Sequence, residues 1–237
     1  MTEEEKPLTR EEVLKMIEEH GGPEGLDLCG RNLEGINLSS ETKNEEFLHL
    51  PSIIISKGVK PLDLHGIVVI GANLQQAELS GANLQGANLF KAKLQGAFLI
   101  DANLRRAYLS SAELQGALLW HADLEGATLE YAELQGTELK EANLKGANLE
   151  YATLRGAYLE GFTIDSNTKL QNVDWGHDYM VREEKERWFQ AAQGIYRILK
   201  QWHTQAGIYD IAGEFYFREM TVKRKALRWW PNPLPRA

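Results

Sequence analysis

The sequence predicts a mainly β fold in which one short unit repeats and stacks on itself, a solenoid. Leucine recurs at every fifth residue from Leu74 to Leu159, and alanine stands two residues before each leucine except at Thr137. The apolar spacing itself runs from Leu64 to Ile164. A period of five fits neither the helix, with 3.6 residues per turn, nor the flat strand. A short fixed period is typical of solenoids, whose units bury their apolar faces against neighbouring units.

The two apolar positions of each unit define the interior of this solenoid. Residues two apart in an extended segment point to the same side, so we expect leucine and alanine to fill a narrow core together. The last residue of the unit is glycine at 86, 96, 116, 126, 136, 146 and 156, and it is larger at most positions between them. Alternation over ten residues predicts a coil with an even number of sides.

The residues before the repeats predict a helix and a partial coil. Thr9 and Glu12 form a capping box, and Gly21-Gly22 ends the expected helix of residues 8–20. We assign residues 1–25 to this N-terminal capping helix. Residues 26–61 contain leucine at 28, 33 and 38, spaced for a first coil, followed by an irregular insertion.

Residues 62–166 form the predicted solenoid, and two columns of polar side chains are expected on its outside. We expect the glutamines at 75, 95, 115 and 135 to form an amide ladder along the axis. We expect Asn83, Asn103, Asp123 and Asn143 to support the turn backbone through local hydrogen bonds.

Residues 175–237 lack the repeat and predict a C-terminal helical region with two helices. Apolar residues of the first helix, residues 181–203, recur at helical spacing: Trp188, Ala192, Ile195, Leu199 and Trp202. The second helix begins at 208, and its expected apolar face comprises Ile208, Ile211, Ala212, Phe215, Tyr216 and Val222.

The stretch "GANLQGANLF" (residues 81–90) and its neighbours resemble the pentapeptide-repeat family, whose motif is A(D/N)LXX. The resemblance implies a right-handed quadrilateral β-helix with four pentapeptides, or twenty residues, per coil. Residues 191–220 are similar to a single tetratricopeptide-type helical pair. They are also similar to segments that link the repeats to transmembrane helices in larger pentapeptide-repeat membrane proteins.

Composition and motifs argue against catalysis. The chain has one cysteine, Cys29, and its six histidines lack the spacing of metal ligands. It also lacks a phosphate-binding glycine loop and a nucleophile paired with a base. The sequence therefore predicts a protein that is not an enzyme, with no cofactor and no metal. An acidic N-terminus unlike a secretory signal indicates a cytoplasmic location, with the inner face of the membrane left open as an alternative.

Four apolar side chains define the candidate interaction patch: Phe98, Ile100, Leu118 and Trp120. They occupy outward slots that elsewhere hold polar residues, and contiguous apolar surface usually marks an interface. Two possibilities remain open for this patch. Either the chain's own C-terminal helices or its 39–61 segment cover it, or a protein partner or a second copy of the chain binds there.

The charge distribution suggests a second contact at the C-terminal end. The net charge of −8 divides into −13 for residues 1–180 and +5 for residues 181–237. The candidate membrane or partner-contact tail comprises Lys223, Arg224, Lys225, Arg228, Trp229 and Trp230. Basic residues beside tryptophans suit a membrane interface.

Three functions follow from these observations. The first is a non-enzymatic scaffold that mediates protein–protein interaction through its β-helix surface. The second is a soluble or peripheral module of a membrane protein assembly. The third is the DNA mimicry that the resemblance associates with topoisomerase-protecting family members. Lysine and arginine are interleaved with the acidic residues of the repeats, which weakens the third interpretation and argues against direct nucleic-acid binding.

Overall fold

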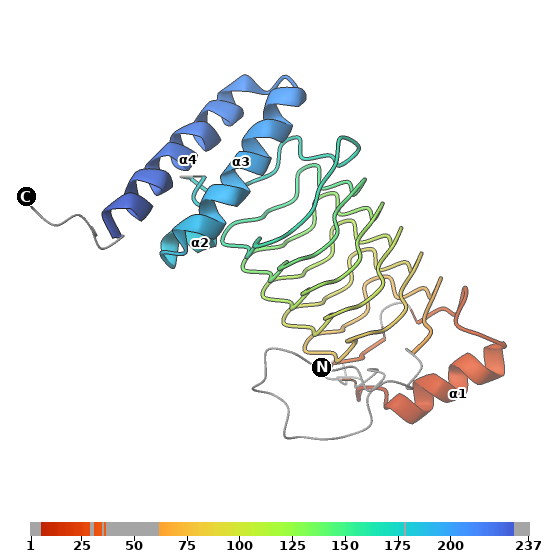
Figure 1. The fold of residues 1–237 in the computed structure, drawn as a ribbon. Helices are drawn as coiled ribbons and strands as arrows, with labels where there is room; N and C mark the ends of the chain where they lie inside the picture. Colours follow the sequence, from red (N-terminus) through yellow and green to blue (C-terminus); the bar gives the residue numbers. More distant parts are fainter. Residues whose placement is uncertain (1–5, 29–30, 35, 37–61, 178, 230–237) are drawn as a thin grey trace, which may run out of the picture.

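The computed structural model describes residues 6–28, 31–34, 36, 62–177 and 179–229. Its elements in chain order are α1 (Arg10–His20), the solenoid, α2 (Arg182–Lys185), α3 (Phe189–Gln205) and α4 (Tyr209–Trp229). Figure 1 shows α1 at one end of the solenoid and the α3–α4 pair across the other end. The predicted capping helix and the predicted C-terminal pair therefore lie at opposite ends of the coil stack.

The solenoid is built from parallel bridges between residues twenty apart, for example Asn83↔Asn103 and Asn103↔Asp123. This register confirms four five-residue units per coil. The inward positions are closed to solvent, as Leu104 (0% exposed) and Ala102 (1% exposed) illustrate. The right-handed winding implied by the resemblance stays a prediction.

Each corner of the coil is a tight turn that requires a left-handed residue. At one corner the Ala92 N–H donates to the Leu89 carbonyl at 3.0 Å, and Lys91 between them has φ of 55°. The corner before it has Gly86 at φ 66°. Glycine adopts this conformation without steric cost, which explains why it recurs at the last position of the unit.

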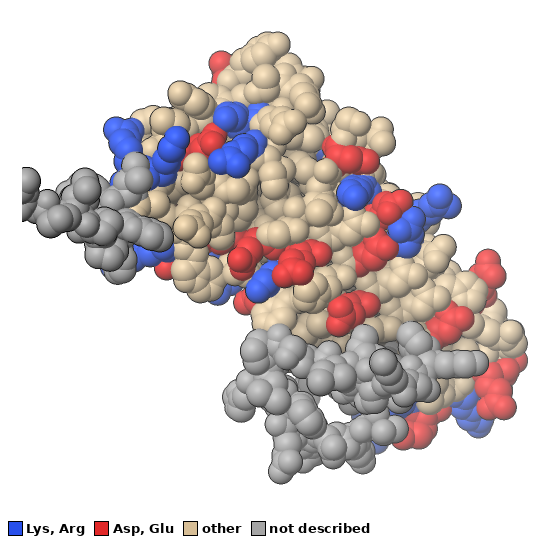
Figure 2. Space-filling model, viewed as in Figure 1, with Lys and Arg blue, Asp and Glu red and all other residues tan. Residues whose placement is uncertain are grey.

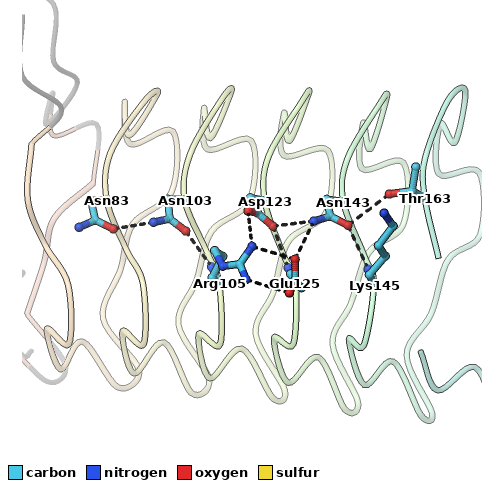
Figure 3. A network of polar contacts seen from close by, with 8 residues as sticks. All are labelled: Asn83, Asn103, Arg105, Asp123, Glu125, Asn143, Lys145 and Thr163. Atoms are coloured by element: carbon cyan, nitrogen blue, oxygen red, sulfur yellow. Dashed lines mark hydrogen bonds and ion pairs between the residues drawn. The ribbon is translucent and has the colours of Figure 1, made fainter. Parts of the chain in front are cut away.

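The asparagine column supports the turns as predicted. The side-chain oxygens of Asn83, Asn103, Asp123 and Asn143 each accept from the backbone N–H two residues further along. Along the axis, Asn103 Nδ2 donates to Asn83 Oδ1 at 2.9 Å, and Asn143 Nδ2 donates to Asp123 Oδ1 at 3.0 Å (Figure 3). Asp123 carries a carboxylate, so it cannot donate a hydrogen bond to Asn103 as an asparagine would. The Arg105 guanidinium donates to the Asp123 carboxylate at 3.1 Å.

The predicted glutamine ladder is present only at its first step. Gln75 Nε2 donates to Gln95 Oε1 at 3.0 Å. Further along, the amide of Gln95 donates to Glu113 and that of Gln115 donates to Glu133, both on the neighbouring column. A carboxylate accepts more strongly than an amide oxygen, so the continuous ladder was a wrong expectation.

The N-terminal end follows the sequence prediction closely. Thr9 caps α1 through the capping box with Glu12, and Gly21 ends it in the left-handed conformation. Leu28 and Leu33 are buried, and the bridges Asp27↔Val68 and Asn32↔Asn73 add a partial coil to the stack. Leu38 and the rest of the predicted insertion lie outside the described residues.

At the other end the bridge ladder continues two steps beyond residue 166, where the leucine spacing stops. Asn148 pairs with Lys169 and Thr153 with Asp174, twenty-one residues apart instead of twenty. The turn around Asp165 accommodates the extra residue, because its Oδ1 accepts from the backbone N–H groups of Gly146, Asn167 and Thr168.

The C-terminal helices differ from the prediction in two places. The expected helix 181–203 is broken into α2 and α3, and Trp188 lies between them with its side chain 49% exposed instead of in the helix core. In α4, Phe215 and Val222 are buried, but Tyr216 is 54% exposed. Each long helix buries one face against its neighbours. Trp188 and Tyr216 lie outside these buried faces.

Two buried carboxylates hold the helical pair on the solenoid. Glu183 accepts from the backbone N–H of Leu159 in the outer coils at 2.5 Å. Glu184 accepts from the Tyr196 hydroxyl at 2.7 Å and pairs with Lys225 at 2.6 Å. The short α2 helix therefore contacts the solenoid through one glutamate and both long helices through the next.

The first testable prediction concerns the interior. We expect Leu124→Ala to lower the free energy of unfolding by about 2–5 kcal/mol, because it removes buried contacts and leaves a cavity. Gln115→Ala, at a half-exposed outward position, should cost much less. Thermal melts of the two variants check this, and equal losses would contradict the assignment of inward and outward positions.

The second prediction concerns pH. His203 is buried against Trp175 and Phe215, and this burial lowers its pKa. The unfolded chain then binds a proton more readily than the folded one, so stability falls as pH drops below about 6.5. We expect His203→Phe to reduce the loss of melting temperature between about pH 7.5 and about pH 5.5. Equal losses in parent and variant would assign the pH dependence to other groups.

Candidate interaction site

The structure brings the four residues of the candidate interaction patch onto one side of the solenoid. Phe98 and Leu118 form a parallel bridge, so they are neighbours on adjacent coils. Ile100 and Trp120 occupy the equivalent slots two residues later, where the Asp101 N–H donates to the Trp120 carbonyl at 2.9 Å. All four residues are partly buried. They therefore lie together on adjacent coils, and their role as an interaction patch stays a prediction.

The patch continues into a groove at the helical end of the solenoid. The column of Phe98 and Leu118 runs on through Glu138 to Tyr158. Beside it a groove of 340 Å³ is lined by aromatic residues (Trp120, Tyr158 and Trp188) and by charged or polar ones (His121, Glu138, Lys140, Glu141, Arg182 and Glu186). One wall thus belongs to the solenoid, and the other to α2 and the residues that follow it.

Glu138 connects the two walls of the groove. It accepts from the Trp120 indole N–H at 2.7 Å and pairs with Arg182 at 3.4 Å. Arg182 also lies over the Tyr158 ring at 5.8 Å, and Trp188 meets the same ring edge-on at 5.4 Å. These contacts fix the orientation of Trp120 and of α2, so the groove is largely preorganised.

Two groups that line the groove have raised pKa values, Tyr158 and Arg182. Burial, and then the hydrogen bond from its hydroxyl to Glu160, raise the pKa of Tyr158. Its hydroxyl therefore stays a donor at neutral pH. The neighbouring Glu186 carboxylate raises the pKa of Arg182, which keeps its charge. The groove accordingly offers aromatic surface and fixed charges.

The structure describes only some side chains of the candidate membrane or partner-contact tail, and these have different roles. Lys223 and Arg224 are exposed on α4. Lys225 pairs with the buried Glu184 at 2.6 Å, so it serves in packing the helices. Arg228 and Trp229 belong to α4 but their side chains are not described, and Trp230 lies outside the described residues.

Several charged side chains of the solenoid form ion pairs with one another. Arg105 makes two contacts of 2.8 Å with Glu125, and ion pairs also join Lys140 to Glu160 and Arg155 to Asp174. Figure 2 shows acidic and basic side chains interleaved along this surface. The solenoid therefore lacks a uniformly negative face in the part of the chain seen in that view.

Neither metal ligation nor a membrane span is indicated within the described ranges. There, no group of three or more His, Cys, Asp or Glu residues could hold a metal ion. None of the described helices combines the length and the apolar character needed to cross a bilayer.

Sequence reasoning missed the groove itself. The sequence placed Tyr158 farther along the patch. It did not predict that Arg182 and Trp188 approach Tyr158, which they do because α2 folds back onto the solenoid. The sequence separation of 44 between Glu138 and Arg182 gives no periodic signal. The one local hint was the paired acids of the 181–188 segment, Glu183 and Glu184, which are unusual in a helix that must dock.

The repeats match a known family. The family model for pentapeptide repeats matches in 8 copies, at residues 70–106, 87–126, 107–146 and 122–161. No curated protein matches the chain significantly.

Several solved structures are similar to the chain. A pentapeptide repeat protein from the cyanobacterium Cyanothece 51142 is 32% identical over 62% of this chain and 90% of its own, with a TM-score of 0.29. One from the Arabidopsis thaliana thylakoid lumen is also 32% identical, over 38% of this chain and 59% of its own, with a TM-score of 0.31. The match thus spans less than two thirds of the Arabidopsis protein.

QnrB1, a plasmid-mediated fluoroquinolone resistance protein, is 17% identical over 63% of this chain and 77% of its own, with a TM-score of 0.30. Because the superpositions are this loose, the family assignment depends on the repeat motif and not on overall shape.

Proposed function

Since the chain belongs to the pentapeptide-repeat family, we propose that it is a non-enzymatic scaffold that binds a protein partner through one face of its β-helix. The observation that supports this proposal is the patch of Phe98, Ile100, Leu118 and Trp120, which the chain's own α2 approaches at its edge and which is only partly buried. Stacked apolar residues on two adjacent coils are seldom left in water unless a partner covers them.

The adjoining groove supports the same proposal. Tryptophan, tyrosine and arginine contribute most of the binding energy in protein interfaces, and Trp120, Tyr158 and Arg182 line this groove together. Its volume of 340 Å³ suits one or two side chains of a partner. The hydrogen bonds of Glu138 hold the walls in place, which lowers the entropy that binding must overcome.

DNA mimicry receives less support than protein binding. A protein that imitates DNA needs dense, regular negative charge, whereas Glu125, Glu160 and Asp174 on this solenoid are each paired with a cation. QnrB1 is named as a fluoroquinolone resistance protein, and this property belongs to QnrB1. A module of a membrane assembly remains the alternative, supported by the exposed cations Lys223 and Arg224.

The third prediction tests the patch. Leu118→Lys should abolish recovery of the partner in an affinity pull-down from the native host while leaving the melting temperature nearly unchanged, because the new ammonium lies on the surface beside Glu138. Thr128→Lys is the matched control, since Thr128 holds the equivalent half-exposed slot on the opposite face of the same coil. Proteins retained by the control and lost with Leu118→Lys would be the specific partners.

Two outcomes would contradict the scaffold proposal. Identical recovery by the parent and by both variants would show that the patch contacts no partner. A large drop in melting temperature with Leu118→Lys alone would show that the chain itself covers the patch.

The fourth prediction concerns topoisomerases. We expect no inhibition of DNA supercoiling by gyrase at protein concentrations comparable to that of the enzyme, because the surface charge is mixed. A supercoiling assay at two salt concentrations checks this, and inhibition that weakens with salt would favour DNA mimicry over the scaffold function.

A further inference from the structure

The groove beside the candidate interaction patch carries more negative charge than its cations neutralise. Its charged lining residues are three carboxylates and two cations: Glu138, Glu141, Glu186, Lys140 and Arg182. Glu160 adds a fourth carboxylate at the edge, where it accepts from the Tyr158 hydroxyl at 2.5 Å. Counted with histidine neutral, the groove and its edge are therefore acidic.

Both cations of the groove already have carboxylate partners within the chain. Arg182 donates from Nε to Glu186 at 2.7 Å and from Nη1 to Glu138 at 3.4 Å. The Lys140 ammonium lies 3.7 Å from Glu160. An acidic side chain of a partner would therefore have to displace one of these carboxylates to gain a cation.

Two carboxylates of the groove retain oxygens that can accept a hydrogen bond. Glu141 Oε2 lies 3.3 Å from His121 Nδ1, and the Glu141 side chain is 52% exposed. Its Oε1 and the Oε2 of Glu186 accept from no donor in the part of the chain that the structure describes. A carboxylate offers about four lone-pair sites, so both groups can accept from a further N–H donor.

Aromatic rings supply the rest of the groove. Trp188 is half-exposed, and Trp120 and Tyr158 line the groove with it. Arg182 lies over the Tyr158 ring at 5.8 Å, within the distance at which an aromatic face attracts a cation. The structure thus already holds one guanidinium of the chain against an aromatic ring and two carboxylates.

We propose that this groove binds the side chain of an arginine from a basic segment of the partner protein. The inference rests on the scaffold function proposed above and assigns the chemistry of the partner. The arginine stacks on the exposed Trp188 ring and donates to Glu141. Arginine is favoured over lysine because its planar guanidinium both stacks on aromatic rings and forms paired hydrogen bonds with a carboxylate.

Other classes of partner fit the groove less well. A phosphate group or a nucleic acid would bring negative charge toward Glu141 and Glu186. An aliphatic side chain could pack on Trp188, but it would cover these carboxylates without pairing them, and burying an unpaired charge is costly. A cationic side chain satisfies the aromatic rings and the carboxylates at once.

Short capped peptides test the proposal on the full chain. The probe is acetyl-Gly-Arg-Gly-amide, and its control contains citrulline, which has nearly the shape of arginine without the charge. The arginine peptide should shift the indole N–H NMR signals of Trp120 and Trp188, assigned with Trp120→Phe and Trp188→Phe. We expect a dissociation constant of roughly 1–10 mM, because one cation–π contact and one charge-assisted hydrogen bond are modest interactions. The citrulline peptide should shift neither signal at the same concentrations.

Two neighbouring substitutions should change the dissociation constant of the arginine peptide in opposite directions. Glu141→Gln should raise it about threefold or more, because the acceptor loses its charge. Lys140→Gln should lower it about twofold, because a repelling cation is removed. A merely structural disturbance of the groove would not produce opposite signs.

The matched control variant is Glu130→Gln, the same change at a partly buried position on the opposite face of the solenoid. It should bind the arginine peptide like the parent. Raising the salt concentration should weaken binding by the parent, since exposed charges are screened.

Three results would overturn the inference. The arginine and citrulline peptides could shift the two indole signals equally, or Glu141→Gln could bind the arginine peptide as tightly as the parent does. The third is tighter binding of acetyl-Gly-Glu-Gly-amide than of the arginine peptide, which would assign the groove to an acidic partner held by Arg182 and Lys140.

Failure of this inference and failure of the scaffold function give different results. Loss of partner recovery with Leu118→Lys but not with Glu141→Gln would overturn the arginine groove and keep the scaffold function. Binding of the arginine peptide, together with unchanged recovery for both variants, would support the arginine groove and contradict the scaffold function.

Discussion

Burial of one leucine and one alanine from every five-residue unit is the interaction on which the rest of the structure depends. A single coil cannot cover these side chains, so every coil requires a neighbour on each side. The interior is complete at Leu99 and Ala97, both 0% exposed. It tolerates Thr137 in an alanine position because the threonine hydroxyl donates to the Leu114 carbonyl at 2.8 Å, leaving no buried donor unpaired.

Stacking of this kind leaves two open ends whose backbone groups need partners. The C-terminal helices supply them from side chains. Glu183 accepts from the Leu159 N–H at 2.5 Å, and the Trp202 indole donates to the Thr168 carbonyl at 3.1 Å. The helical pair therefore does more than shield apolar surface, since it completes the hydrogen bonding of the last coils. Its position is fixed by polar contacts as well as by packing.

Outward positions of the repeat do not have to fill the interior. Their residues therefore vary from unit to unit. Most hold ion pairs and amide contacts that stabilise neighbouring coils, such as the one between Arg105 and Glu125. The patch around Trp120 on the solenoid departs from that pattern.

The sequence by itself determined a coil with an even number of sides, the turn-supporting asparagines, the capped α1 and the existence of two C-terminal helices, while the length of twenty residues per coil came from the family resemblance. Each of these depends on local geometry or on a strict period, and both are readable from one chain. Tertiary structure decided the rest. The helices carry apolar residues on two sides, so only packing selects Phe215 over Tyr216 for burial. The groove joins Glu138 to Arg182 across 44 residues. This contact follows from three-dimensional proximity, because α2 folds back onto the solenoid, and no repeat spacing along the chain encodes it.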